Sequence, residues 1–281
     1  MPKALTLRFW GVRGAIAVPG PYTVRYGGNT ACVSLHLGDD AVLILDAGTG
    51  IRNLGKMLAS SNADLYLVVT HIHWDHIQGF PFFGPIYQPR RLTCVVPNLG
   101  ETLARALVEQ MDGNRFPVRI DDLLSERRII FDDPRPLLMG TGFEVERIGL
   151  NHPGGGFGYR VENEGRRVVY LTDNELNPPG APVTSQDEFV AFCKDADVLI
   201  HDAQYLAADM PAHHGWGHSL VSQVLELAVA AGVKHLVLFH HDPDRSDDAI
   251  DAIQTEARAW LQAHAPWLHC TAAFEGLTIR L

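Results

Sequence analysis

Four side chains that can bind a metal ion, three histidines and one aspartate, lie within the six residues from His71 to His76. Residues 65–69, directly before them, are aliphatic, aromatic or β-branched, and this pattern predicts a buried strand. The loop that leaves such a strand sits on a rigid scaffold, which can direct several side chains to one point. Neutral imidazole suits zinc, and the carboxylate of Asp75 adds a harder, charged donor. The chain is therefore expected to build a metal site at the end of a strand.

The bulk properties indicate an ordinary globular protein. The 281 residues are 46% hydrophobic and 20% charged, which is close to the average of folded chains and leaves enough apolar surface for a large core. The four cysteines are far apart and form no CxxC pair, so we expect them in the core of a protein from a reducing compartment. No apolar segment resembles a signal peptide or approaches the ~20 residues that span a bilayer. We expect a cytoplasmic protein without a membrane contact.

The formal net charge of -10 bears on the substrate. Proteins bind long nucleic acids mainly by neutralising phosphates, which requires a basic face. Part of the acidity belongs to candidate metal ligands, and bound cations would offset it. The charge balance nevertheless argues against a long nucleic acid as the partner.

The order of the predicted elements indicates one compact α/β domain over residues 1–281, built from two similar halves. Apolar runs, several of them rich in β-branched residues, predict strands at 5–9, 31–37, 41–45, 65–69, 92–96, 145–150, 158–162, 168–171, 198–200 and 236–239. Helical patterns and caps predict helices at 51–60, 101–111, 186–193 after Ser185, 220–231 after Ser219, and 248–264.

Two groups of apolar residues admit two interpretations each. The aromatic residues of the irregular segment 80–140 either pack into the core or form a wall that faces the substrate; they are Phe80, Phe82, Phe83, Tyr87 and Phe116. Leu220, Val224 and Leu227 either pack internally or form part of a homodimer interface.

The residues from His71 to His76 cannot complete two metal sites alone, so further ligands must come from later strand ends. Three residues occupy that position: His152 follows the strand predicted at 145–150, Asp173 follows 168–171, and His240 follows 236–239. Binding sites of α/β proteins form at such strand ends. His241 competes with His240, since sequence alone does not separate tandem histidines.

With Asp46, these residues resemble the five motifs of the metallo-β-lactamase superfamily, in the same order and over nearly the whole chain. The resemblance implies a four-layer αββα sandwich with two divalent metal ions at one edge of its two sheets. It implies zinc first, although manganese or iron suits such ligands too. By this resemblance, one ion binds His71, His73 and His152, the other binds Asp75, His76 and His240, and Asp173 bridges them. Asp46 either orients a ligand or forms a turn.

Two further segments, His201-Asp202-Ala203 and Gly217-His218-Ser219, resemble the ribonuclease Z-like phosphodiesterase branch of that superfamily. There an acidic residue pairs with a histidine, which can protonate the alkoxide that leaves phosphorus. The resemblance implies catalytic roles for Asp75, Asp202 and His218. The alternative is that His218 lies on the surface at a helix start and that Asp202 is a structural cap. The segment 27–30 either presents backbone N–H groups to an anion or forms a plain turn.

The chain departs from transfer-RNA-processing ribonuclease Z in one respect. That family usually inserts a long arm, which grips the RNA, between the motifs that correspond to His152 and Asp173, and these lie only 21 positions apart here. We therefore expect a phosphodiesterase of small anionic substrates, such as cyclic nucleotides or sugar cyclic phosphates. Two alternatives stay open: a thioester hydrolase of the glyoxalase II type, and a non-catalytic regulator that binds nucleotides through its metal ions.

Overall fold

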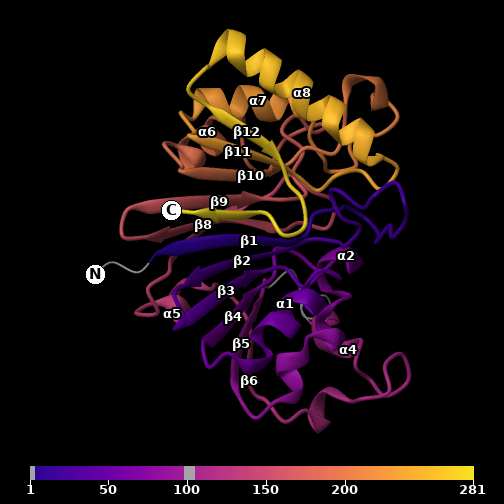
Figure 1. Ribbon diagram of the computed structural model, residues 1–281, viewed down its shortest axis with the longest axis vertical. Helices are drawn as coiled ribbons and strands as arrows, with labels where there is room; N and C mark the ends of the chain where they lie inside the picture. Colours follow the sequence, from indigo (N-terminus) through magenta and orange to yellow (C-terminus); the bar gives the residue numbers. More distant parts are fainter. Residues whose placement is uncertain (1–3, 98–104) are drawn as a thin grey trace.

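The computed structural model describes residues 4–97 and 105–281, and its strands form two mixed sheets (Figure 1). The first sheet has the order β13-β1-β2-β3-β4-β5-β6 and the second β12-β11-β10-β9-β8-β7. The strands of the first sheet are β1 Leu5–Gly11, β2 Cys32–Leu37, β3 Ala41–Leu45, β4 Asp64–Val68, β5 Arg91–Val96, β6 Glu126–Phe131 and β13 Thr278–Arg280. Those of the second are β7 Glu144–Gly149, β8 Phe157–Asn163, β9 Arg166–Leu171, β10 Val198–Asp202, β11 His235–Phe239 and β12 His269–Ala272.

Helices cover the outer face of each sheet. The α-helices are α1 Ile51–Met57, α2 Trp74–Ile77, α4 Ala106–Glu109, α5 Arg135–Leu138, α6 Gln186–Cys193, α7 Val221–Ala230 and α8 Asp247–His264. Short 3₁₀ segments are η1 Leu58–Ser60, η2 Phe80–Phe82, η3 Gly84–Tyr87, η4 Ile120–Asp122 and η5 Ala207–Asp209. None of the helices in the described ranges has both the length and the apolar character needed to cross a membrane.

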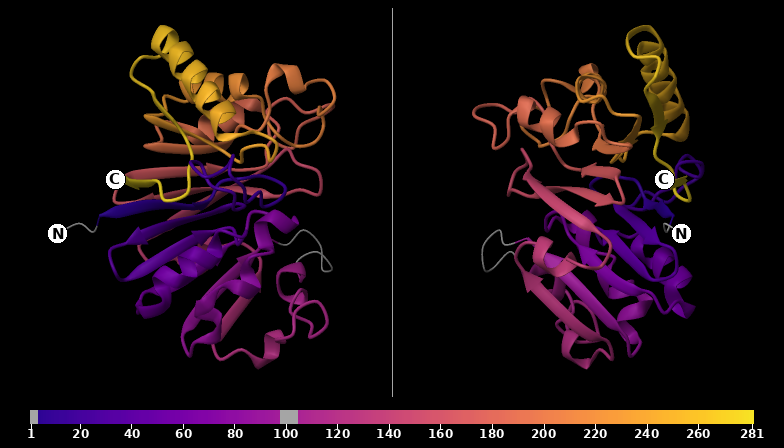
Figure 2. Two further views of the ribbon diagram at one scale, coloured as in Figure 1. Left: turned by 45° about the vertical axis from the view of Figure 1, so that its right-hand side comes forward. Right: turned by 90° about the vertical axis from the view of Figure 1, so that its left-hand side faces the viewer.

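Three apolar cores separate four layers, which confirms the predicted αββα sandwich. Side chains such as Phe9 and Tyr170 fill the core between the two sheets. A second core lies between the sheet of β7–β12 and the helices α6, α7 and α8, and a third lies beneath α1 on the other sheet. Figures 1 and 2 show these helices on the two outer faces. Because the central strands are buried on both faces, they read as continuous apolar runs: all five residues of β3 are buried.

The strand directions decide where the functional side chains meet. β3 and β4 are parallel to each other, and β9, β10 and β11 are parallel in the second sheet. The carboxyl ends of parallel strands lie at the same edge of their sheet. Residues that follow these strands in both sheets, such as Asp46, His71, Asp173 and His240, therefore come together.

The predicted helix caps and boundaries agree with the structure only in part. The capping box at Ser185 is confirmed, since Ser185 Oγ accepts from the Glu188 N–H and Glu188 Oε2 accepts from the Ser185 N–H. The cap at Ser219 is wrong, because that hydroxyl donates to the Asn174 carbonyl at 2.6 Å and α7 begins only at Val221. The helix predicted at 101–111 falls partly on 101–104, outside the described residues, and α4 ends at Glu109.

The apolar residues with two interpretations are mostly internal. Phe80 and Phe83 are fully buried in the core beneath α1, whereas Phe82 is exposed and packs edge-on against Phe116. Val224 and Leu227 are fully buried on the inner side of α7, so these two side chains pack internally, whereas Leu220 is only half-buried.

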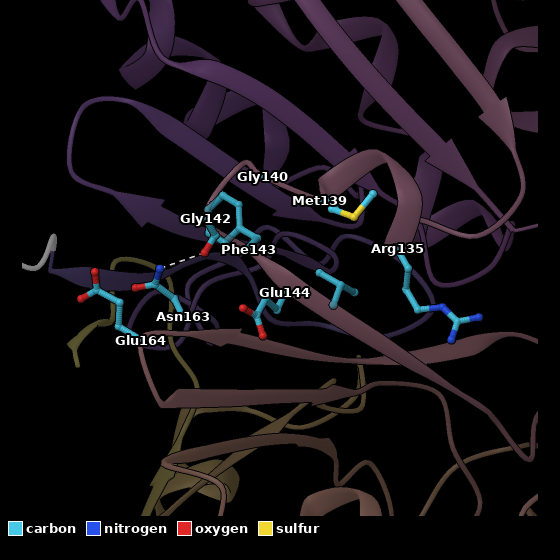
Figure 3. Close-up of a pocket in the computed structure, with 9 residues that line it drawn as sticks. Arg135, Met139, Gly140, Gly142, Phe143, Glu144, Asn163 and Glu164 are labelled. Atoms are coloured by element: carbon cyan, nitrogen blue, oxygen red, sulfur yellow. Dashed lines mark hydrogen bonds between the residues drawn. The ribbon is translucent and has the colours of Figure 1, made fainter.

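A cavity of about 640 Å³ lies where β7 begins and β8 ends (Figure 3). It is lined by charged side chains, among them Arg135, Glu144 and Glu164. His152 follows the opposite end of β7, so this cavity is separate from the candidate metal ligands.

Candidate metal centre

Three strand-end residues of the site adopt a left-handed backbone conformation that residues other than glycine rarely adopt. The φ angles are 63° at Asp46, 52° at Asp173 and 57° at His240. Such conformations cost about 1–3 kcal/mol each and persist where the surrounding structure imposes them. Each residue directly follows or closely follows a strand, so the sharp turn holds its side chain at the sheet edge.

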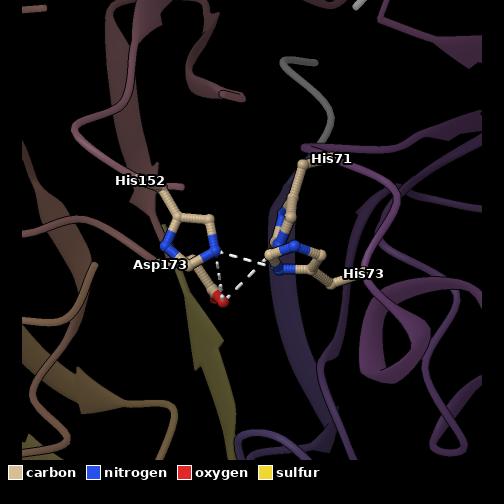
Figure 4. Close-up of side chains that lie close together, drawn as sticks. All are labelled: His71, His73, His152 and Asp173. Atoms are coloured by element: carbon tan, nitrogen blue, oxygen red, sulfur yellow. Dashed lines mark hydrogen bonds and ion pairs between the residues drawn. The ribbon is translucent and has the colours of Figure 1, made fainter. Parts of the chain in front are cut away.

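The first group of candidate ligands comprises His71, His73, His152 and Asp173, which point toward one another in Figure 4. One donor atom from each lies within 4.8 Å of the others. His152 Nε2 is 3.0 Å from His73 Nδ1 and 3.7 Å from Asp173 Oδ2, and His71 Nε2 is 3.6 Å from the same oxygen. Three imidazoles and one carboxylate oxygen therefore surround one point, as a metal ion with nitrogen and oxygen ligands requires.

The second group comprises Asp75, His76, Asp173 and His240, and all four are buried. Nε2 of His76 and Nε2 of His240 each lie 3.1 Å from Asp173 Oδ1 and 3.2 Å from Asp75 Oδ2. Asp173 thus turns one carboxylate oxygen to each group. This is the arrangement of a carboxylate that can bridge two ions.

The outer nitrogens of these histidines are held by hydrogen bonds. His76 Nδ1 donates to Asp46 Oδ2 at 2.9 Å, His152 Nδ1 to the Gly217 carbonyl at 3.0 Å, and His240 Nδ1 to Gln204 Oε1 at 2.9 Å. With the proton on Nδ1, each Nε2 carries a lone pair that faces the site. Such contacts fix the tautomer and the ring orientation of metal-binding histidines.

The donor set fits divalent cations. Nε2 of His71 and Nε2 of His76 are buried and make no hydrogen bond. Their lone pairs face the carboxylate oxygens of Asp173 at 3.6 and 3.1 Å, and two lone pairs at that distance repel unless a cation lies between them. Nitrogen and carboxylate donors are those that zinc, manganese and iron bind.

The electrostatics keep the histidines of the first group and Asp173 in the forms that bind metal ions, whereas His76 is held protonated. Burial lowers the pKa of His71 well below its usual range and that of His152 to about 4. Burial opposes ionisation of Asp173, but the facing His240, His76 and His71 hold its pKa well below the ordinary value. Burial opposes the charge of His76, but the neighbouring carboxylates outweigh it and raise the pKa of His76 well above its usual range, so a metal ion that binds His76 would displace a proton.

Asp202 and His218 form a buried pair beside the second group. His218 Nδ1 lies 2.6 Å from Asp202 Oδ2, and the His218 ring stacks on the ring of His240 with centroids 5.1 Å apart. Burial opposes the charge on His218, yet the Asp202 carboxylate outweighs it and raises the pKa of His218 to about 9. The burial of both side chains excludes the alternative in which His218 is a surface residue.

The remaining sequence candidates lie around this centre. His241 turns away and donates to the Ala273 carbonyl at 2.9 Å, whereas His240 faces the site. Asp46 belongs to neither donor group and instead orients His76. In the segment 27–30, the Asn29 N–H donates to Glu275 and the Thr30 N–H to Thr49 Oγ1, which favours the plain turn.

Several groups that hold the candidate ligands were not predicted from the sequence, among them the Gly217 carbonyl, Gln204 and the Ala15 N–H. Gln204 orients His240, and its position directly after Asp202-Ala203 was an available signal. The backbone N–H of Ala15 donates to Asp75 Oδ2 at 2.9 Å. Ala15 adopts a left-handed backbone conformation, which an alanine in the sequence does not indicate.

Comparison with known proteins identifies the family. The sequence model of a family described as a beta-lactamase superfamily domain matches residues 42–241, more than half of the chain. The chain belongs to the β-lactamase superfamily. Membership confirms the superfamily that the five motifs predict, and the matched range contains every candidate ligand.

Individual members of the superfamily resemble this chain over most of its length. A ribonuclease Z from Streptomyces avermitilis is 27% identical over 267 residues, which cover 79% of this chain and 83% of that protein. The structure of the metallo-β-lactamase fold protein YhfI from Bacillus subtilis is 18% identical, with a TM-score of 0.67, and covers 99% of this chain and 100% of that chain. A diphosphatase of the PhnP family is also 18% identical, with a TM-score of 0.66 and coverage of 99% and 98%. The two structures show the shared fold.

Proposed function

We propose that this protein is a metal-dependent phosphodiesterase of small substrates that holds two divalent ions, most readily zinc. The main support for this proposal is the two donor groups that share Asp173, with the Asp202–His218 pair beside them. The proposed ligands are His71, His73, Asp75, His76, His152, Asp173 and His240. The similarity to proteins named ribonuclease Z and to a diphosphatase supports phosphoester chemistry.

The residues of the chain supply specific parts of this chemistry. When bound, two divalent ions would activate a water molecule and offset the charge of the phosphoryl oxygens. The Asp202 carboxylate accepts the Nδ1 proton of His218, which leaves His218 Nε2 to donate a proton to the leaving alkoxide. Protonation matters because an alkoxide leaves phosphorus poorly. Asp202 holds the imidazole in the required tautomer and stabilises its charged form.

Two features support a small substrate. The interval between His152 and Asp173 contains a glycine loop and the hairpin of β8 and β9, which turns at Glu164-Gly165. This hairpin belongs to the second sheet, so the interval contains no separate arm that could grip an RNA. The net charge of -10 also disfavours a long polyanion.

The first experiment is turnover by protein loaded with zinc or manganese. We expect hydrolysis of bis(p-nitrophenyl) phosphate and of cyclic nucleotides, and kcat/KM at least ~100-fold lower for His73→Ala and His218→Ala, since loss of general acid catalysis alone costs about 10²–10⁴-fold. His73→Ala should also lose metal, whereas His218→Ala should retain it. His269→Ala, which removes an exposed histidine at the start of β12, is the matched control.

Three results would change the proposal. Metal-loaded protein without turnover of any phosphodiester would refute it. A preference for precursor transfer RNA would replace the small substrate with a polymer. A higher kcat/KM for thioesters than for phosphodiesters would establish the glyoxalase II-type alternative.

A further inference from the structure

Glu175 is a buried carboxylate to which the proposed chemistry assigns no role. It lies two residues after Asp173 and is only 2% exposed. Among the described residues, its ion-pair contact is His214, whose Nε2 is 3.6 Å away and donates to the Asn177 carbonyl at 3.0 Å. A buried carboxylate is costly unless several donors compensate it. The hydrogen-bond donors around the Glu175 carboxylate therefore indicate its role.

Those donors belong to the backbone of one loop. The Gly215 N–H lies 2.9 Å from Glu175 Oε1 and 3.1 Å from Oε2, and the Gly217 N–H lies 2.9 Å from Oε2. The next residues add a second link between the same two segments. Ser219 Oγ donates to the Asn174 carbonyl at 2.6 Å and accepts from the Leu176 N–H at 3.1 Å.

This loop carries two functional contacts within two residues. The Gly217 carbonyl accepts from Nδ1 of His152, and His218 follows directly in the chain. A carbonyl or carboxylate on the outer nitrogen decides which way a ligand histidine points. The conformation of the loop thus determines the orientation of His152 and the position of His218 together.

We propose that Glu175 is a positioning residue, which orients His152 through Gly217 and places His218 through the loop backbone. This inference rests on the proposed function, because it takes His152 as a metal ligand and His218 as the proton donor. Glu175 and Asp173 belong to the same segment after β9. Only one residue therefore separates Asp173, whose carboxylate would bridge the ions, from Glu175, whose carboxylate fixes the loop.

Glu175→Gln tests the proposal with little change in side-chain volume. The amide keeps one acceptor oxygen but turns an NH2 group toward a backbone N–H, so at least one hydrogen bond is lost. Glu175→Asp keeps the charge but is one methylene shorter. Glu188→Gln is the matched control, because Glu188 also accepts from a backbone N–H, that of Ser185 at 2.8 Å, but lies exposed on α6.

The decisive readouts are metal affinity, measured by chelator competition, and the visible spectrum of the cobalt-substituted protein. For Glu175→Gln we expect about 10–100-fold weaker binding of one of the two ions, a changed cobalt spectrum and a lower kcat. We expect Glu175→Asp to lie between Glu175→Gln and the wild type, and Glu188→Gln to bind both ions as the wild type does. If Glu175→Gln does not fold, the same measurements on Glu175→Asp decide.

Wild-type affinity for both ions and an unchanged cobalt spectrum in the folded variant would overturn the proposal, even if turnover fell. Metal binding and the cobalt spectrum do not depend on the substrate. They therefore test Glu175 even if the wild-type protein shows no phosphodiesterase activity, and the two failures remain distinguishable.

Discussion

Asp46 is fully buried behind the candidate metal centre and accepts hydrogen bonds from three residues. Its carboxylate contacts the Thr70 N–H at 2.7 Å, His76 Nδ1 at 2.9 Å and the Tyr170 hydroxyl at 3.0 Å. It thus joins the loop of β4, a candidate ligand and the second sheet. The resemblance to the superfamily motifs implied this orienting role, with a turn as the alternative. It did not reveal the partner Tyr170, which lies 124 positions away in the chain.

We expect Asp46→Asn to weaken metal binding by about 10–100-fold, because the amide nitrogen cannot accept from His76 or Thr70. Asparagine tolerates the left-handed backbone at φ 63°, so the fold should be retained. Chelator competition measures the change in affinity. Tyr170→Phe removes one donor but leaves the carboxylate, and it should have the smaller effect. Equal affinities for Asp46→Asn and the wild type would show that Asp46 does not orient His76.

At the scale of the element, the loop that ends in His218 depends on a glycine. Gly217 has φ 88°, and a Cβ atom there would lie 2.1 Å from His152 Nδ1. We expect Gly217→Ala to displace His152 and to lower both metal affinity and kcat by at least ~10-fold. Gly180→Ala is a close control: Gly180 has φ 94°, and its Cβ would meet nothing within 4 Å.

The two alanine variants share the strain of a side chain at positive φ, and only one of them collides with a candidate ligand. Thermal unfolding should therefore show a loss of stability in both, while chelator competition should separate them. If both variants bind zinc like the wild type, the loop is not tied to His152 in the way that the structure indicates.

Strands buried on both faces were predictable from sequence, and most edge strands were not. The apolar runs of β3, β4 and β11 stand out because no polar residue interrupts them. β6, β12 and β13 lie at the edges of their sheets and were not predicted, whereas the edge strand β7 was predicted at 145–150. β6 carries Glu126, Arg127 and Arg128 because one of its sides has no neighbouring strand, and its pairing with β5 makes it a strand.

At the scale of the whole molecule, the order of the motifs predicted both the fold and the candidate ligands. Each ligand candidate is a metal-binding residue type just after an apolar strand, so sequence and topology point to the same edge. The supports of the site escaped prediction for a physical reason. Glu175 acts on backbone N–H groups about 40 positions away, and Ala15 contributes only its own N–H, so neither forms a local pattern.

The fold also predicts how the stability of the molecule depends on pH through His36, outside the metal centre. Trp10 Nε1 donates to Ser34 Oγ at 2.7 Å, which leaves the Ser34 hydroxyl to donate to His36 Nε2 at 2.8 Å. This series of hydrogen bonds requires the neutral form of the His36 imidazole. Burial, aided by the charge of Arg8, accordingly lowers the pKa of His36 from 6.5 to about 4.

Because the folded state binds the proton less tightly than the unfolded state, the contribution of His36 is full above pH 6.5 and is lost as the pH falls toward 4. With allowance for the partial exposure of the ring, we expect a loss of ~2 kcal/mol in the free energy of unfolding. Urea unfolding of the wild type and of His36→Gln at pH 7.5 and pH 4.5 measures it, since other histidines contribute equally to both proteins. The wild type should lose more stability than His36→Gln, while His269→Gln, at an exposed position, should follow the wild type. Parallel losses in the wild type and His36→Gln would mean that His36 already accepts a proton in the folded protein.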